Sequence, residues 1–396
     1  MTQDKQNNRP NVPPLRFPEF ADEWKRTSIG KCCSSLEYGM NAAAKEYDGR
    51  NKYIRITDID ETTSKYCNDD VVSPSGELED KYLVRENDIL FARTGASVGK
   101  TYHYDISDGK LYFAGFLIRG NVLSCYNSKF VFYQTQLPRY EKWVKVMSAR
   151  SGQPGINSQE YEGFNLFMPT RFEQDKIESF ISLLDHRIEV QSGLIEDLQK
   201  LKAALVERLF CNKQGWKRYK YRDLLSPISE RNSGNQFSNV LSASQELGMV
   251  SRTDLDIDIK FDRSAVTTYK IVRDGDYVLH LRSFQGGLAF SSMTGICSPA
   301  YTILRPVKEL EYGFFQEYFM SKPFINSLRL VTYGIRDGRS INVDEFLDMP
   351  VEIPDSTTQC RIISILSIMN RRLRLAIKQN ENFIKQKQYL LQQMFI

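Results

Sequence analysis

The chain has 396 residues, which is enough for two or three domains that each bury a core of their own. Hydrophobic residues make up 41% and charged residues 26%, as in an ordinary globular protein, and the net charge of +4 permits nucleic-acid binding without arguing for it. No apolar run is long enough to cross a bilayer, and the polar, proline-containing start resembles neither a signal peptide nor a membrane anchor. Seven cysteines without a CxxC pair and only three histidines argue against a zinc site, so we expect reduced thiols and a cytoplasmic protein.

A polar leader over residues 1–22 precedes the first globular region, which begins at Trp24. Short runs of β-branched and aromatic residues alternate there with Gly, Asn, Asp and Ser, a pattern typical of short strands joined by turns. The predicted elements are strands at 53–56, 88–92 and 111–118, a helix at 128–145 and a last strand that ends at Pro169.

A long helix is predicted next, over residues 171–212. Its apolar residues recur in steps of four and three, which places them on one narrow face. So narrow a face suits a partner helix, although a helix that packs only on its own domain is the alternative. The residues expected to pair this helix with a second one, or to dock a partner, are Ile181, Leu184, Ile188, Leu198 and Leu205, and in the second helix Leu366, Met369, Leu373, Phe383 and Leu390.

The second helix follows from an internal duplication. Residues 156–210 and 341–395 are identical at fourteen of 55 positions without a gap, well above the level expected by chance. We therefore predict an α/β (α+β) protein with two related globular regions, each followed by a long helix, and the two helices paired as an antiparallel coiled coil. The predicted segments are 1–170, 171–212, 213–355 and 356–396, with Trp216 opening the second globular region as Trp24 opens the first.

Polar residues interrupt the apolar face of both helices, at Gln191 and Lys202 in the first and at Asn380 and Lys387 in the second. The two lysines are equivalent, since they lie 185 positions apart, the offset of the duplication. They either lie in the contact and fix its register, or lie at its edge with only their stems in contact.

The stretch Gly95–Thr101 (GASVGKT) invites comparison with a phosphate-binding P-loop. A P-loop needs four residues between its first Gly and the Gly-Lys-Thr, and here there are three. It also opens a helix, whereas residues 101–105 are predicted as a strand. We interpret the stretch as a tight turn that exposes Arg93, Thr94 and Lys100.

No catalytic or metal-binding set emerges elsewhere. The three histidines have no recognisable spacing to a nucleophile, and the Asp254-x-Asp256-x-Asp258 run lacks the Gly and terminal Glu of a calcium loop. We therefore expect a binding protein with no catalytic residue, no metal and no cofactor of its own.

Both halves carry Arg, Lys, Ser, Thr, Asn and Gln on glycine-rich turns. Arg and Lys can contact guanine edges, Asn and Gln can contact adenine edges, and any cation can hold phosphate. The candidate DNA-binding residues are Asn41, Lys45, Arg55, Arg93, Thr94, Lys100, Arg150 and Gln153 in the first half, and Arg231, Ser242, Ser244, Arg282, Ser283, Gln285, Arg336 and Arg339 in the second.

Several marks together resemble one family. They are the leader Phe17-Pro18-Glu19-Phe20, the turn from Asn87 to Gly99, the pair Ile156-Asn157, and Pro169 with Glu173-Gln174 before the helix. With two globular regions and two related helices, the chain resembles the specificity subunit of type I restriction–modification systems over nearly its whole length. The second copy departs from these marks at Thr358-Gln359 and through the additional Leu281.

The resemblance implies a non-catalytic subunit in which each globular region recognises one half of a bipartite, asymmetric DNA site. It implies that the helices set the gap between the half-sites and dock two modification subunits, which methylate adenine with S-adenosylmethionine. Restriction subunits that use ATP and Mg²⁺ would join the complex. A coiled-coil scaffold that joins protein partners without touching DNA is the alternative, and an NTP-driven enzyme is a more distant one.

Overall fold

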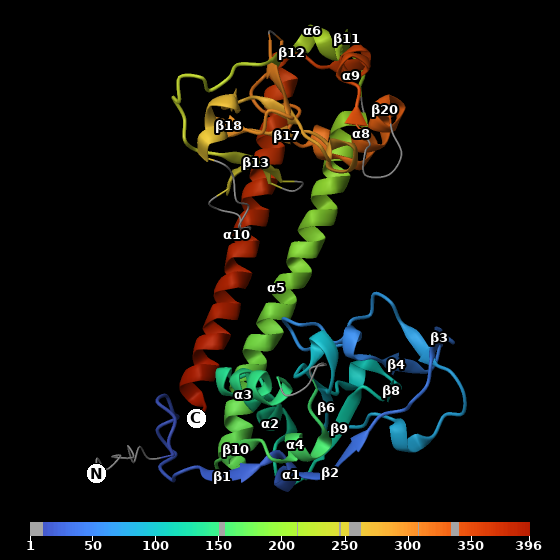
Figure 1. Ribbon diagram of the computed structural model, residues 1–396, viewed down its shortest axis with the longest axis vertical. Coiled ribbons are helices and arrows are strands. Elements are labelled where there is room, and N and C mark those ends of the chain that lie inside the picture. Colours follow the sequence, from blue (N-terminus) through green and yellow to red (C-terminus); the bar gives the residue numbers. More distant parts are fainter. Residues whose placement is uncertain are drawn as a thin grey trace. The chain divides into compact units, whose positions relative to one another are not determined.

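The computed structural model describes residues 11–149, 155–211, 213–244, 247–252, 263–307, 309–333 and 340–396. The chain forms two compact units: unit 1 contains the residues up to 190 together with 379–396, and unit 2 contains 191–378. The helices α5 (Arg171–Cys211) and α10 (Ser356–Met394) each begin in one unit and end in the other (Figure 1). The boundary between the units therefore falls within the long helices rather than at their ends. None of the described helices has the length and apolar character to span a membrane.

Unit 1 is built on an antiparallel sheet of four strands in the order β2 (Cys33–Tyr38), β9 (Leu117–Val122), β6 (Asp88–Ala92), β7 (Thr101–His103). Side chains alternate across β6 as a strand requires. Ile89 and Phe91 join the core that includes the long helices, whereas Leu90 and Ala92 join a separate cluster on the opposite face. The sheet is thus buried on both faces.

Short elements complete unit 1. The paired strands β1 (Lys25–Ser28) and β10 (Asn165–Met168) bring the start of the globular region beside its end. The others are α1 (Ile29–Cys32), α4 (Ser158–Glu162), the parallel pair β4 (Lys52–Ile54) and β8 (Leu111–Phe113), and the antiparallel pair β3 (Ala44–Glu46) and β5 (Val72–Pro74).

Two predicted elements of unit 1 are wrong in detail. The strand predicted at 111–118 is two strands, β8 and β9, which belong to different sheets because the chain turns at residues 114–116. The helix predicted at 128–145 is two helices, α2 (Ser128–Gln134) and α3 (Pro138–Ser148). Pro138 occupies the first turn of α3 and disfavours a helical conformation at the residue before it, so the first helix ends.

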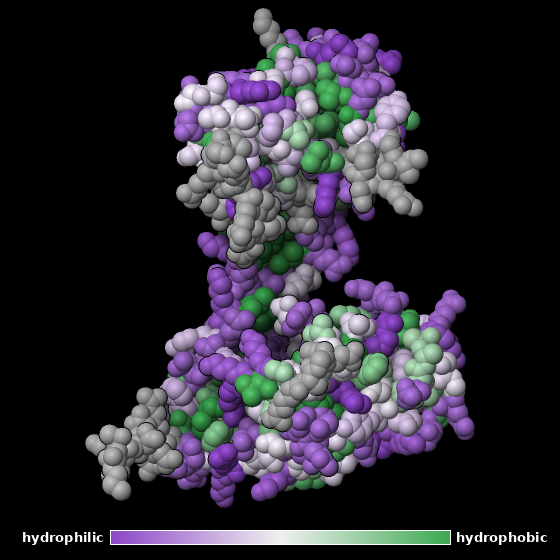
Figure 2. Space-filling view, in the orientation of Figure 1, coloured by the Kyte–Doolittle hydropathy of each residue, from purple (hydrophilic) through white to green (hydrophobic). Residues whose placement is uncertain are grey.

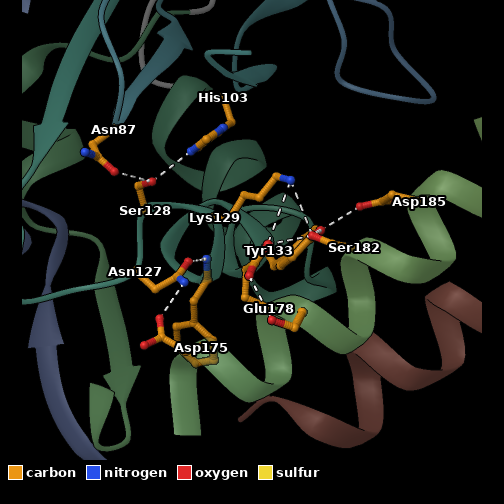
Figure 3. Close-up of polar contacts among 12 residues, drawn as sticks. Asn87, His103, Asn127, Ser128, Lys129, Tyr133, Asp175, Glu178, Ser182 and Asp185 are labelled. Carbon is orange, nitrogen blue, oxygen red and sulfur yellow. Dashed lines mark hydrogen bonds and ion pairs between the residues drawn. The ribbon is translucent and has the colours of Figure 1, made fainter. Parts of the chain in front are cut away.

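Polar side chains fix α2 to the first turns of α5 (Figure 3). The Tyr133 hydroxyl donates to Asp185 Oδ2 over 2.6 Å, and Asn127 Nδ2 donates to Asp175 Oδ1 over 2.8 Å. Lys129 Nζ lies 3.3 Å from the Ser182 hydroxyl. Because these partners lie on successive turns of α5, the globular part of unit 1 is held at one place along the helix.

Unit 2 repeats the four-stranded sheet as β12 (Leu225–Ile228), β19 (Thr302–Pro306), β16 (Tyr277–Leu279), β17 (Ala289–Phe290). In place of α2 and α3, unit 2 has only α8 (Lys322–Ser327) between two 3-10 turns, and Pro323 lies in its first turn. The remaining elements are α6 (Tyr221–Leu224), α7 (Ser283–Gly286), α9 (Val343–Asp348) and the antiparallel pairs β11 (Lys217–Lys220) with β22 (Pro350–Ile353), β13 (Leu241–Ser244) with β14 (Gly248–Ser251), β15 (Lys270–Val272) with β18 (Gly295–Cys297), and β20 (Thr332–Tyr333) with β21 (Ser340–Ile341).

The identical residues of the duplication have identical structural roles. Asn157 and Asn342 each cap a short helix, where the side-chain oxygen accepts a bond from the backbone N–H three residues on. Gln174 and Gln359, both buried, each donate Nε2 to the carbonyl of the proline five residues earlier, over 3.0 Å in both cases. Each glutamine also accepts a backbone N–H from the globular part through Oε1. These residues fasten each globular part to its helix.

The two long helices pair antiparallel within each unit. In unit 1 the first turns of α5, at Ile181 and Leu184, share a core with the last turns of α10, at Leu390 and Met394. In unit 2 the end of α5 shares a core with the start of α10. Of the predicted pairing residues, Ile181, Leu184, Leu366, Met369 and Leu390 are buried, and Ile188, Leu198, Leu205, Leu373 and Phe383 are half-buried. The fold class and the helix pairing are confirmed.

Polar residues in the helix pair behave in two ways. The buried Gln191 donates Nε2 to the carbonyl of Ala376, its equivalent in the other repeat, over 2.9 Å, which fixes the register of the contact. The lysines instead direct their charges out of the contact: Lys387 Nζ lies 2.6 Å from Asp185 Oδ1, and Lys202 Nζ lies 2.7 Å from Glu317 Oε2. This favours the interpretation in which only the lysine stems line the helix contact.

Candidate nucleic-acid interface

Three side chains gather at one end of the sheet of unit 1. Tyr38 ends β2, Arg93 follows the last residue of β6, and Phe116 precedes the first residue of β9. Because β9 lies between β2 and β6 and runs antiparallel to both, these three positions share one end of the sheet. We call Tyr38, Arg93 and Phe116 the Arg93 cluster.

The backbone of Arg93 is held on both sides. Its N–H donates to the carbonyl of Phe116 over 3.0 Å, and its carbonyl accepts the N–H of Ile156 over 2.9 Å. The guanidinium carbon lies 4.7 Å from the centre of the Tyr38 ring, in a cation–π contact. Within the described residues this guanidinium forms no ion pair with a carboxylate. The Arg93 side chain is therefore oriented by an aromatic surface rather than by an opposite charge.

Tyr38 is itself fixed. Its hydroxyl accepts bonds from the Ser158 N–H at 3.1 Å and the Ser158 hydroxyl at 3.2 Å, at the start of α4. Burial raises the pKa of Tyr38, but the Ser158 bonds and the charge of Arg93 outweigh it, so the pKa lies below its ordinary value. The next residue, Gly39, has no room for a side chain, because a Cβ there would lie 2.2 Å from the Ala114 carbonyl oxygen. The ring is thus positioned from both sides.

The segment after Arg93 is the tight turn predicted from the sequence, not a P-loop. Residues 95–97 form a single 3-10 turn, Gly95 and Gly99 have positive φ angles of 70° and 88°, and the chain returns into β7. The Gly99 N–H donates to the Ala92 carbonyl over 2.9 Å, and so closes the turn on itself. Thr94 and Lys100 are half-buried on it, and Lys100 Nζ lies 3.9 Å from Glu61 Oε2.

The other predicted DNA-binding residues of unit 1 differ in their surroundings. Asn41 and Lys45 are exposed. Arg55 is bound by Asp58, at 2.8 Å, and by Asp70, at 3.1 Å, so its donors are already occupied. Arg150 and Gln153 lie outside the described residues. Their roles stay predictions.

In unit 2, Arg231, Arg282 and Gln285 are exposed and Ser244 is half-buried. Ser242 is mostly buried, and its hydroxyl accepts a bond from Arg252 Nε over 2.8 Å. Ser283 is fully buried, and its hydroxyl accepts the His280 N–H over 2.8 Å, a position that does not support contact with DNA. Arg336, Arg339 and the 254–258 acidic run lie outside the described residues.

Each of the two sheets contains a buried aspartate, and these two residues show which positions of the sheets correspond. Asp88 Oδ2 accepts the N–H of Arg85 and Oδ1 accepts a bond from Asn121 across the sheet, at 2.8 and 2.7 Å. Asp276 accepts the N–H of Arg273 in the same way and is bound by Arg305, with two bonds of 2.8 Å. Asp276 is therefore the counterpart of Asp88, and Arg305 the counterpart of Asn121.

Counting five residues along each strand from these pairs gives the counterpart of the Arg93 cluster in unit 2. Leu281 stands for Arg93, Ala300 for Phe116 and, from the sheet register, Ser229 for Tyr38. All three are exposed, and Leu281 exposes 66% of its surface. We call them the Leu281 cluster. The matched ends of the two sheets therefore present different chemistry.

Sequence reasoning found Arg93 but missed Tyr38 and Phe116. Tyr38 lies 55 positions before Arg93, and only strand pairing brings the two together. Phe116 fell within a predicted strand and lies instead in the turn before β9, where it is 59% exposed. In the sequence, the one signal for this turn was the glycine directly before the aromatic residue, Gly115-Phe116. On the visible face of the molecule, hydrophilic residues cover most of the surface, and apolar residues form separate patches among them (Figure 2).

Within the described part of the chain, no group of His, Cys, Asp and Glu residues could hold a metal ion. All seven cysteines are free thiols, and burial raises the pKa of Cys32 to about 11 and that of Cys297 to about 12.

Residues 22–200 match the family model described as the type I restriction modification DNA specificity domain. Over these residues the chain is similar to that family's domain. The specificity domain covers the globular part of unit 1 and more than half of α5. Its assignment confirms the resemblance inferred from the sequence marks.

Relatives extend the likeness. The type I restriction enzyme MjaVIII specificity subunit of Methanocaldococcus jannaschii is 22% identical over 209 residues, which span 52% of this chain and 45% of that protein. The chain thus aligns with about half the length of this curated relative. A type I restriction–modification system S subunit from M. genitalium has a TM-score of 0.58 at 14% identity, with 97% of this chain and 99% of that chain covered.

A further solved chain comes from a study of complex assembly and conformational transition of the type I R-M system. It has a TM-score of 0.57 at 14% identity, and the match covers 94% of this chain and 97% of that one. At such low identity these two structures show a shared fold. That fold includes the second unit, which lies mostly beyond the matched specificity domain.

Proposed function

We propose that this chain is the DNA-recognition subunit of a type I restriction–modification complex. Each unit would contact one half of a bipartite, asymmetric site, and α5 with α10 would set the spacing between the halves. Modification subunits would supply methylation of adenine with S-adenosylmethionine, and restriction subunits would use ATP and Mg²⁺. The complex would act in the cytoplasm, and this chain would carry no catalytic residue.

The observation that carries the proposal is the contrast within the duplication. Residues that fasten each globular part to its helix are the same in both repeats, as Asn157 and Gln174 with their counterparts show. The matched ends of the sheets instead carry unlike residues, at Arg93 and Leu281. A common frame with two different surfaces is what recognition of two unlike half-sites requires.

A second feature supports docking of two identical partners. Apolar side chains lie exposed one position before the pairing residues, so they form a separate stripe on each helix. Leu183 and Val190 on α5 are 64% and 58% exposed, and their equivalents Ile368 and Leu375 on α10 are 59% and 58% exposed. Phe180 and Ile365 extend the two stripes. Equivalent apolar stripes in the two repeats suit two copies of one modification subunit.

DNA recognition is tested with the full chain bound to its modification subunits. We expect the complex to bind its methylation site at least about a thousandfold more tightly than scrambled DNA at physiological salt. Lowering the salt should raise the affinity for both DNAs, because phosphate contacts release counterions. Equal binding of the two DNAs, with the assembly intact, would instead support a protein scaffold.

The docking stripes are tested by changing each one separately. Leu183→Glu should leave one modification subunit bound in place of two, and Ile368→Glu should do the same from the other stripe. Leu201→Glu is the matched control, since Leu201 is 54% exposed on α5 but its equivalent on α10 is a glutamine. Native mass spectrometry counts the subunits. Two bound subunits in both variants would contradict this docking surface.

A further inference from the structure

Arg93 differs from Arg16, Arg55 and Arg119 of the same unit in what surrounds it. Arg55 is paired with Asp58 and Asp70, Arg16 with Glu173, and Arg119 with Glu37. Their fork-shaped donor groups are occupied within the protein. The Arg93 guanidinium lies instead against the face of an aromatic ring. Stacking uses the flat face of a guanidinium and leaves its in-plane N–H groups free to bond elsewhere.

The position of Arg93 is also fixed closely enough for base recognition. Its backbone N–H and carbonyl are both bonded, to Phe116 and Ile156. The ring on which it lies is held through its hydroxyl by Ser158. A guanidinium with free in-plane donors and a fixed orientation matches the O6 and N7 acceptors on the major-groove edge of guanine. Loosely held lysines such as Lys45 lack both properties.

Phe116 adds a second contact beside the first. It is the cross-strand neighbour of Arg93, and 59% of its surface is exposed although the side chain is apolar. An aromatic side chain next to a guanine-binding arginine can contact the 5-methyl group of a neighbouring thymine. The exposed ring is apolar, so a base that covers it removes apolar area from solvent, which is favourable.

We infer that Arg93, held against Tyr38, recognises a guanine in the half-site contacted by unit 1, with Phe116 against the adjacent base. This inference rests on the proposed function and adds the base, the residue and the supporting ring. Tyr38 acts as a positioning residue, because its ring orients the guanidinium and need not touch DNA. Ser158 supports it from behind through the ring hydroxyl.

The test compares variants of the full chain, each assembled with its modification subunits, in a selection from randomised DNA. The wild-type complex should prefer guanine at one position of one half-site by about 10-fold to 100-fold. Arg93→Lys keeps the charge but loses the fork, so this preference should fall below about 3-fold while the other positions keep theirs. Tyr38→Leu should weaken the same position, and Tyr38→Phe, which keeps the ring, should weaken it less.

Arg171→Lys is the matched control, because the Arg171 guanidinium is bound by Asp175 and by the Tyr126 carbonyl, so this variant should leave the selected motif unchanged. A synthetic site with 7-deazaguanine at the affected position separates the contacts further. It lacks the N7 acceptor, so it should weaken binding by the wild type more than binding by Arg93→Lys, whose ammonium lacks the planar fork.

Three outcomes would overturn the inference. The first is an unchanged motif in Arg93→Lys. The second is an equal loss of affinity for every sequence, which indicates a phosphate contact. The third is a wild-type motif in which the half-site contacted by unit 1 contains no guanine. A wild-type complex without any sequence preference would instead refute the proposed function, so the two failures are distinguishable.

Discussion

The two units place unlike residues on matched positions of one frame, and two of these differences have separate consequences. At the start of the long helix, Glu173 in unit 1 is replaced by Thr358 in unit 2. At the end of the sheet, the Arg93 cluster is replaced by the Leu281 cluster. The first difference concerns how the chain is held together, because Glu173 binds Arg16 of the leader and also accepts the indole N–H of Trp24. The second concerns what each unit presents to a partner.

The first difference follows from chain connectivity. Unit 2 is entered directly from α5, through residues 213–216, and Phe210 packs against Trp216. Unit 1 is entered from a separate leader, and Trp24 packs against Phe395, which follows the last residue of α10. The buried Arg16–Glu173 pair holds this leader on the helix where unit 2 has a covalent connection. A carboxylate is therefore needed at one helix start and not at the other.

The largest expected effect breaks the leader contact. Glu173→Gln should lower the free energy of unfolding of unit 1 by about 3 kcal/mol, because it leaves the buried Arg16 without its counter-charge. Thr358→Val, at the equivalent and half-buried position, should cost less than about 0.5 kcal/mol. Chemical denaturation followed by Trp24 fluorescence measures the first change, and Trp216 fluorescence the second. Equal costs at the two positions would refute this account.

The buried aspartates provide a second comparison, of intermediate size. Asp276→Asn should destabilise unit 2 by about 2 kcal/mol, since two charge-assisted bonds to Arg305 are lost. Asp88→Asn should cost unit 1 only about 1 kcal/mol, because its cross-strand partner Asn121 is neutral and its ion pair with Arg119 is long, at 3.9 Å. Denaturation curves of the two variants give the difference, and a larger cost at Asp88 would contradict it.

Asp88 also predicts a pH dependence that its asparagine variant should lose. Burial raises the pKa of Asp88 above the ordinary value for an aspartate. A raised pKa in the folded state means that the protonated carboxyl is favoured by folding. The contribution of Asp88 to stability is therefore greatest at acidic pH and falls as the pH rises through the folded-state pKa. The stability difference between wild type and Asp88→Asn should follow this trend.

The smallest expected effect sharpens the comparison of the sheet ends. Introducing Ser229→Tyr together with Leu281→Arg gives unit 2 the counterparts of Tyr38 and Arg93, two of the three residues of the Arg93 cluster. We expect the motif selected by the complex to gain a guanine preference of about 10-fold at one position of the second half-site. Leu281→Arg alone should gain less, since the guanidinium lacks its supporting ring. No change of motif in the double variant would show that the strand ends do not reach DNA in unit 2.

The frame was largely predictable because its signals are local or repeated. The spacing of Ile181, Leu184 and their successors defines a helix face from sequence alone, and the offset of 185 residues identifies the second helix. The polar turns were also found, because Gly and Asn mark turns directly. The residues that fasten each globular part to its long helix, such as Gln174 and Gln359, were recognised as identical, although their hydrogen bonds could not be predicted.

The candidate site was predicted only in part, because it depends on strand pairing. Arg93 lies in a recognisable turn, but its orientation depends on Tyr38, which reaches it across an intervening strand. Single residues also changed the predicted elements. Pro138 divided one helix into two, and the turn at Gly115 divided one strand and left Phe116 exposed. Arg55 looked equally suited to DNA until its ion pairs with Asp58 and Asp70 were known.

The composition of unit 1 has a consequence for biosynthesis. Its core includes Leu390, Met394 and Phe395, and the Leu15 N–H donates to the Gln393 carbonyl over 2.9 Å. Unit 2 consists of residues 191–378, all of which are synthesised before that stretch. The unit that is translated first is therefore the one that finishes folding last, the reverse of the usual N-to-C order. Until then the face of α5 that packs against Leu390 and Met394 is uncovered, and chaperones can bind to it.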